Sequence, residues 1–183
     1  TLPLFGAAAF SAVLAYMAWQ RRPGVGAITF ALYMVASGHW RFAYGMEILA
    51  EEPAVMLFWA KVQYLGISTV AAFCLIFCIQ YARRWQLSAY FYGLLFIIPV
   101  FTIIIAWLEP RTGLLWQEIS VETNDSFSVL TFSYGPVFWL IIAYSYVELI
   151  ASTIILIDLA RRVPELYKKQ INLLVLATLF PWL

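Results

Sequence analysis

Charged residues are scarce in this chain. Of its 183 residues, 11% are Asp, Glu, Lys or Arg, while 64% are hydrophobic. A soluble domain has about 25% charged residues and about 45–50% apolar ones, so this composition excludes an ordinary soluble protein. The basic residues form no stripe that could follow a phosphate backbone, which excludes nucleic acid as a partner.

Residues suited to catalysis or metal binding are also few. His39 is the only histidine and lies within an apolar segment, so no Ser/His/Asp catalytic set can be assembled. Cys74 and Cys78 are one helical turn apart, which suits neither a disulfide nor, without a nearby histidine or carboxylate, a metal site. The sequence also lacks an HExxH motif and a glycine-rich phosphate loop. We therefore expect no catalytic activity, no metal and no cofactor in this chain.

Long apolar runs, in contrast, recur along the whole chain. Each is close to the roughly 20 residues that a helix needs to cross the hydrocarbon core of a bilayer. We predict an all-α polytopic membrane protein, with one transmembrane domain over residues 1–183 in contact with membrane lipid. Six helices are expected, at residues 2–19, 25–50, 54–82, 89–108, 136–159 and 170–183. The last run is cut off at Leu183, and we expect a seventh helix in a longer parent chain.

Basic and acidic residues alternate between successive connections. The basic pairs are Arg21–Arg22, Arg83–Arg84, Arg161–Arg162 and Lys168–Lys169. The acidic residues of the two connections between them are Glu51 and Glu52 in one, and Glu109, Glu118, Glu122 and Asp125 in the other. Because cationic loops are retained on the cytoplasmic side, we predict that the N-terminus and the acidic connections lie outside the cell.

The long acidic connection, residues 109–135, has the pattern of a β-hairpin. Two runs rich in β-forming residues, 115–121 and 127–132, flank a cluster of turn-forming residues. This pattern predicts a short external hairpin over 115–132, between the fourth and fifth helices. Since an isolated hairpin is marginally stable in water, we expect it to pack on the helices through Trp116 and Phe127.

Four ionisable residues lie inside the apolar runs: Arg41, Glu47, Lys61 and Glu148. Charges inside a bilayer are costly and usually face a partner or a cavity. With a rise of about 1.5 Å per residue, Arg41 matches Glu148 in depth and Glu47 matches Lys61. We predict a buried ion pair between Arg41 and Glu148, with the second and fifth helices as neighbours.

Three interpretations of these charges remain open. They are structural ion pairs, an external-facing cavity that binds a small ligand, or a proton or ion pathway. Trp and Tyr residues at helical spacing beside the charges are compatible with a cavity for an amphipathic molecule. The candidate ligand-binding residues are Trp40, Tyr44, Glu47, Lys61, Tyr64, Trp139 and Glu148.

Short motifs in a fixed order run along nearly the whole chain. They are Trp40, Tyr44 and Glu47; Lys61–Gly66; Leu75–Tyr81; Pro99; Leu115–Trp116; Tyr134–Trp139; Tyr167–Gln170; and Pro181. With these motifs and loop lengths, the chain resembles the N-terminal seven-helix sensor region of prokaryotic membrane histidine kinases.

The resemblance implies a sensory input module of a two-component signal transduction receptor in the plasma membrane of a prokaryote. Such a module would bind an unknown external or intramembrane small ligand and relay a helix shift to a cytoplasmic output domain. The parent chain would then be a sensor histidine kinase and form a homodimer through that output domain. The alternatives are a non-catalytic structural subunit of a larger membrane complex and a small transporter.

Overall fold

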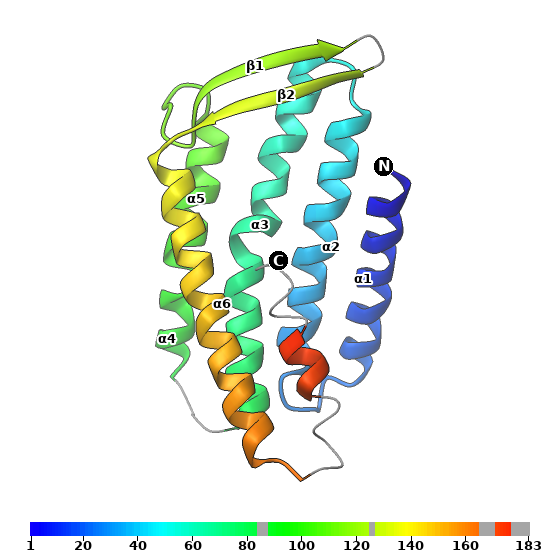
Figure 1. Cartoon of the computed structure of the whole chain (residues 1–183), viewed down its shortest axis with the longest axis vertical. Helices are drawn as coiled ribbons and strands as arrows, with labels where there is room; N and C mark the ends of the chain where they lie inside the picture. The colour runs from blue at the N-terminus through cyan, green and yellow to red at the C-terminus, as the bar shows by residue number, and fades with distance from the viewer. Residues whose placement is uncertain (84–87, 125–126, 165–170, 177–183) are drawn as a thin grey trace.

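The computed structural model describes residues 1–83, 88–124, 127–164 and 171–176, with the backbone alone at 122–124 and 127–129. The helices are α1 (Leu2–Gln20), α2 (Ala27–Leu49), α3 (Pro53–Ala82), α4 (Ala89–Leu94), α5 (Ile97–Leu108) and α6 (Pro136–Arg162). The strands β1 (Trp116–Asn124) and β2 (Phe127–Tyr134) lie between α5 and α6, and residues 171–176 are also helical. The structure is therefore mostly helical with one small sheet (Figure 1).

Local sequence explains where several of these helices begin. Pro53 and Pro136 are the first residues of α3 and α6, where the missing N–H costs no hydrogen bond and the fixed φ suits a helix. Gly26 precedes α2 with a φ of 77°, a left-handed conformation that glycine adopts without strain. This glycine lets the chain reverse after α1 and return as α2.

The apolar run at 89–108 forms two helices where the sequence predicts one kinked helix. The break lies at Leu95 and Phe96, one turn before Pro99. A proline has no N–H for the carbonyl four residues earlier, and its ring clashes with that carbonyl. Here the freed carbonyl of Leu95 accepts a hydrogen bond of 2.8 Å from the Tyr144 hydroxyl of α6. The break is thus compensated by a neighbouring helix.

Four stretches of the described residues are long and apolar enough to cross a membrane: Leu2–Gln20, Pro53–Ala82, Ala89–Leu108 and Pro136–Arg162. The crossing predicted at 25–50 is not among them, although α2 is 23 residues long. The charged residues Arg41 and Glu47 lower the hydropathy of α2. In the structure this helix packs between α1 and α3.

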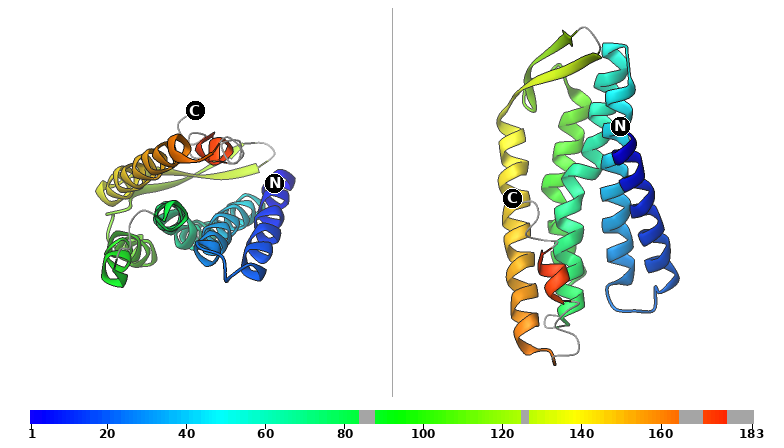
Figure 2. Two further views of the ribbon diagram at one scale, coloured as in Figure 1. Left: turned by 90° about the horizontal axis from the view of Figure 1, so that it is seen from below. Right: turned by 45° about the vertical axis from the view of Figure 1, so that its right-hand side comes forward.

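Helix α3 is the centre of the structure. It packs against α2, α5 and α6. Seen from below, α5, α3, α2 and α1 form one curved row, and α6 and residues 171–176 lie on one side of it (Figure 2). The closest approach involves Gly66 of α3, where a Cβ atom would lie 2.6 Å from the backbone oxygen of Ala36 in α2. Small residues allow this kind of close helix packing in membranes.

The β-hairpin covers one end of the helices (Figure 1). Its strands are antiparallel, with Trp116 opposite Tyr134 and an irregularity in register between Trp116 and Glu118. The side chain of Trp116 is buried, stacking on Phe132 with ring centroids 4.7 Å apart and meeting Tyr64 of α3 edge-on. The predicted contact through the Phe127 side chain lies outside the described residues.

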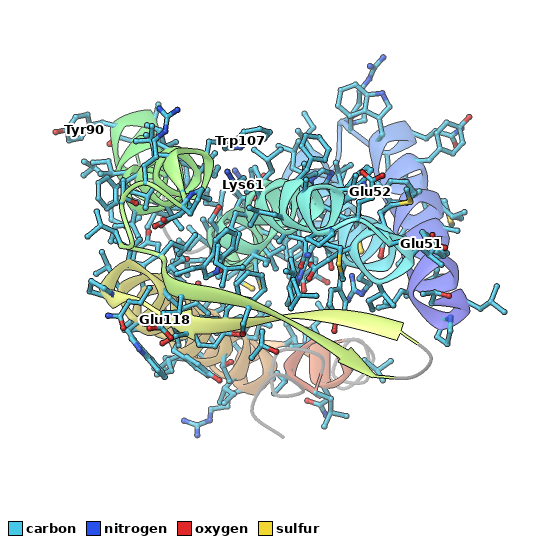
Figure 3. All side chains as sticks on the ribbon, turned by 90° about the horizontal axis from the view of Figure 1, so that it is seen from above. Glu51, Glu52, Lys61, Tyr90, Trp107 and Glu118 are labelled. Carbon is cyan, nitrogen blue, oxygen red and sulfur yellow. The ribbon has the colours of Figure 1, made fainter. Side chains whose placement is uncertain are left out.

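The two ends of the structure differ in charge, and Glu51, Glu52 and Glu118 are labelled at the hairpin end in Figure 3. The end opposite the hairpin holds the helix ends that carry Arg21, Arg22, Arg83, Arg161 and Arg162. The hairpin end holds Glu51, Glu52, Glu109 and Glu118. The alternation in the sequence therefore becomes a separation of charge along the length of the bundle.

Candidate ligand-binding cavity

A cavity of about 660 Å³ lies beneath the hairpin, between α2, α3 and the start of α6. Aromatic side chains make up much of its wall. Trp40 and Tyr44 of α2, Tyr64 of α3, Trp116, Phe132 and Tyr134 of the hairpin, and Phe138 of α6 all line it. Drug-sized ligands bind in cavities of this size and character.

Three polar side chains also reach this cavity. Glu47 is buried at 7% exposure and accepts a hydrogen bond at Oε2 from the amide of Gln63. Arg41 donates to the backbone oxygen of Ser37, 3.0 Å away, and to the Ser37 hydroxyl. The site thus combines rings with one carboxylate, one guanidinium and one amide.

Four of the seven candidate residues predicted from the sequence meet in this cavity: Trp40, Tyr44, Glu47 and Tyr64. The other three do not line it. Lys61 lies on the side of α3 that faces α5, where its ammonium donates to the backbone oxygen of Glu109 (Figure 3). Trp139 is 60% exposed, and Glu148 is 2% exposed on α6. The aromatic and acidic face of α2 therefore correctly indicates part of the cavity wall, whereas Trp139 and Glu148 of α6 lie outside the cavity.

The two charge pairings inferred from depth do not form in the structure. Glu47 is bonded to Gln63, and the Lys61 ammonium donates to the backbone oxygen of Glu109. Neither carboxylate oxygen of Glu148 has a hydrogen-bond partner among the described residues, and Arg41 is bonded to Ser37. Matching residues by depth gives their height along a helix but not the direction in which each side chain points. Helix α3 packs against both α2, which carries Arg41, and α6, which carries Glu148.

Glu109 was not among the candidate residues but organises the approach to the hairpin. Its carboxylate accepts hydrogen bonds from the Thr112 hydroxyl (2.7 Å) and from the backbone N–H groups of Gly113 (3.0 Å) and Leu115 (2.8 Å). Burial acts to raise the pKa of Glu109, but these hydrogen bonds outweigh it and lower the pKa below its ordinary value. The ionised carboxylate therefore fixes the chain just before β1.

Several wall residues were not predicted as ligand contacts. Trp116, Phe132, Tyr134 and Phe138 come from the hairpin and the start of α6, far along the chain from α2. The sequence indicates only one of these contacts, because the hairpin is expected to pack on the helices through Trp116. The sequence does not specify which helix faces that hairpin covers.

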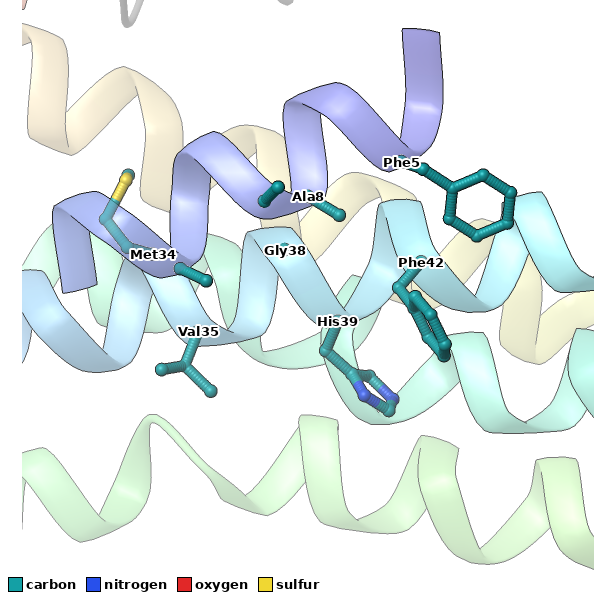
Figure 4. Close-up of a pocket in the computed structure, with 9 residues that line it drawn as sticks. Phe5, Ala8, Met34, Val35, Gly38, His39 and Phe42 are labelled. Atoms are coloured by element: carbon teal, nitrogen blue, oxygen red, sulfur yellow. The ribbon is translucent and has the colours of Figure 1, made fainter. Parts of the chain in front are cut away.

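A second crevice, of about 520 Å³, lies between α1 and α2 (Figure 4). It is lined mainly by apolar residues, including Phe5, Ala8, Met34 and Phe42. His39 is its polar residue, and its Nε2 lies 3.0 Å from the backbone oxygen of Val62. Among the described residues there is no cluster of three His, Cys, Asp or Glu side chains that could hold a metal ion.

Comparison with protein families gives one match that spans nearly the whole chain. The family is described as the N-terminal 7TM region of histidine kinase, and its model matches residues 3–183. Comparison with curated proteins and with solved structures found no match. The chain belongs to the N-terminal seven-transmembrane region of histidine kinases, and it is a non-catalytic input domain of a membrane protein and not itself an enzyme.

Proposed function

We propose that this domain is a sensory input module that binds a small ligand in the cavity beneath the hairpin. The observation that carries the proposal is the cavity itself, where four candidate residues meet aromatic residues of the hairpin and α6. A ligand enclosed there would contact α2 and α3 on one side and the hairpin and α6 on the other. Its binding energy would therefore depend on how these elements are placed relative to one another.

The proposed signal is a movement of α6 relative to α3. A ligand shifts such an equilibrium only if it binds the two arrangements with different affinity. Phe138 lies in the first turn of α6, while Arg161 and Arg162 lie in its last turn. A change at the cavity would thus be transmitted along α6 toward the opposite end of the bundle and to a cytoplasmic output domain, a histidine kinase, in the parent chain.

The proposed setting is the plasma membrane of a prokaryote, crossed several times, with the N-terminus and the hairpin outside. Support comes from the concentration of arginines at the end opposite the hairpin, because basic segments stay on the cytoplasmic side. In this arrangement α2 also crosses the membrane, with α1 and α3 packed against it and exposed apolar side chains such as Ile28, Leu32 and Val35 facing lipid. The partners are membrane lipid, a small molecule and a second copy joined through the output domain.

A cavity-filling substitution tests the proposed function. Ala60 lines the cavity and is buried on α3, so Ala60→Leu would fill part of the space. In the full-length protein reconstituted in nanodiscs, we expect Ala60→Leu to change autophosphorylation several-fold, because it mimics or blocks the ligand. The matched control is Ala54→Leu, an exposed position on the same helix, which should leave the output unchanged. Equal outputs for the two variants would contradict the proposal.

A further inference from the structure

The cavity beneath the hairpin contains a buried carboxylate that has no cationic partner in the part of the chain that the structure describes. Glu47 is 7% exposed, and its hydrogen bond from Gln63 uses Oε2. Among the described residues, no lysine, arginine or histidine lies within ion-pair distance of Glu47. The ion pair that the described residues do form joins Arg162 to Asp158, near the end of α6. Burying an ionised carboxylate in a membrane helix costs desolvation free energy, which a nearby positive charge offsets.

The rings around Glu47 suit a positive charge as well. Tyr44 and Trp40 precede Glu47 on α2, and Tyr64 lies next to Gln63 on α3. The faces of tyrosine and tryptophan rings carry negative electrostatic potential and attract cations, most strongly where water is excluded. Tyr64 also meets Trp116 edge-on, with ring centroids 5.5 Å apart, which joins the helix side of the wall to the hairpin side.

Resting on the proposed function, we propose that the ligand class of this cavity is a small organic ammonium ion, with its charged group against Glu47 and its carbon groups against the aromatic wall. The ammonium group would supply the missing counter-charge for the carboxylate. A neutral ligand of the same shape would leave Glu47 buried and unpaired. An anionic ligand would add repulsion.

Arg41 sets the orientation of such a ligand. It lies six residues before Glu47 on α2, about 9 Å along the helix axis, and lines the same cavity. Its guanidinium is bonded to Ser37, so it remains at the inner end as a fixed positive charge. The ammonium group is therefore directed to the outer end, beside Glu47, and the rest of the molecule extends inward past Tyr44, Trp40 and Ile67.

The test uses choline and 3,3-dimethylbutan-1-ol, a neutral isostere in which carbon replaces the nitrogen. Binding to the full-length protein in nanodiscs is measured by titration calorimetry. We expect choline to bind at least about tenfold more tightly than the isostere, and Glu47→Gln to reduce choline affinity at least about tenfold. The matched control, Glu118→Gln, changes an exposed carboxylate on β1 outside the cavity and should leave the affinity unchanged.

A second variant protects the test against misfolding of Glu47→Gln. Tyr44 is 44% exposed, so Tyr44→Leu removes a ring from the wall without emptying the core, and it should also weaken choline binding. Equal binding of choline and its isostere, no choline binding at millimolar concentration, or unchanged choline affinity in both variants would overturn the ammonium inference.

The two proposals fail separately. If Ala60→Leu changes the output while choline does not bind, the cavity is a sensory site for another class of ligand. If choline binds through Glu47 but neither choline nor Ala60→Leu changes the output, the ammonium site remains and the sensory function falls.

Discussion

At the scale of single residues, Glu109 shows how one carboxylate can fix a loop. It is 2% exposed and accepts hydrogen bonds from Thr112, Gly113 and Leu115. The Lys61 ammonium donates to its backbone oxygen, which ties the end of α5 to α3. The hairpin that covers the cavity therefore starts from a point held by both the side chain and the backbone of one residue.

The lowered pKa of Glu109 predicts a pH dependence for this loop. Because its folded pKa is below its unfolded pKa, the ionised carboxylate stabilises the folded loop above about pH 4, and this contribution is lost as the pH falls through the lowered folded pKa. Hydrogen–deuterium exchange of residues 113–116, corrected for intrinsic rates, should show protection that decreases at acidic pH.

Replacing Glu109 should remove that dependence. In Glu109→Gln, protection of residues 113–116 at neutral pH should fall by at least about tenfold, since a hydrogen bond to a charged group contributes about 1.5–3 kcal/mol. Glu118→Gln, at an exposed position on β1, is the control and should keep the wild-type profile. A Glu109→Gln profile that still follows pH like the wild type would show that another group is responsible.

Arg41 and Glu148 give a second prediction at this scale. The structure bonds Arg41 to Ser37 and leaves both Glu148 carboxylate oxygens without a hydrogen-bond partner among the described residues. The unfolding free energies of Arg41→Gln and Glu148→Gln should therefore add in the double variant to within about 0.5 kcal/mol. A coupling well above 1 kcal/mol, measured by steric trapping or denaturant titration, would instead support the ion pair inferred from depth.

At the scale of elements, the packing of α2 against α3 depends on Gly66. A Cβ atom at this position would lie 2.6 Å from the Ala36 backbone oxygen and 2.9 Å from the Trp40 Cβ. Neither atom can move without shifting α2. Gly66→Ala should therefore destabilise the fold by about 1–3 kcal/mol, although alanine is the better helix former.

The control for this prediction is Gly93 in α4, where a Cβ atom would meet nothing within 4 Å. Gly93→Ala should be neutral or stabilising by up to about 1 kcal/mol. Comparing the unfolding free energies of the two variants separates helix propensity from packing. If both variants have the same stability, close approach at Gly66 does not limit the packing of α2.

The elements also show what sequence reasoning could and could not predict. The apolar runs indicated the segments that became α1, α3 and α6, because length and hydropathy are local properties. The break before Pro99 was anticipated as a kink, but the hydrogen bond from Tyr144 that supports it joins residues 49 positions apart. Likewise, the face of α2 with Trp40, Tyr44 and Glu47 was predicted, whereas its covering by the hairpin depends on tertiary packing.

At the scale of the whole molecule, the separation of charge predicts its orientation. Single cysteines introduced in a background lacking Cys74 and Cys78 can be tested with a membrane-impermeant maleimide in intact cells. We expect labelling at Glu51 and Glu118 and none at Arg21 and Arg161, because the arginine end should face the cytoplasm. Labelling at Arg21 or Arg161 without permeabilisation would contradict this orientation.

The position of α2 has a consequence for how the protein is assembled. A segment with two charges and lower hydropathy gains little by entering lipid alone, and α2 is not among the stretches apolar enough to span a membrane. In the folded protein its polar face meets α3 and the cavity, while α1 covers another face. Stable insertion of α2 should therefore wait until α3 has been synthesised, so that α1, α2 and α3 settle in the bilayer as a three-helix unit. The helix that supplies three of the four candidate residues in the cavity is thus the one that depends on its neighbours to enter the bilayer.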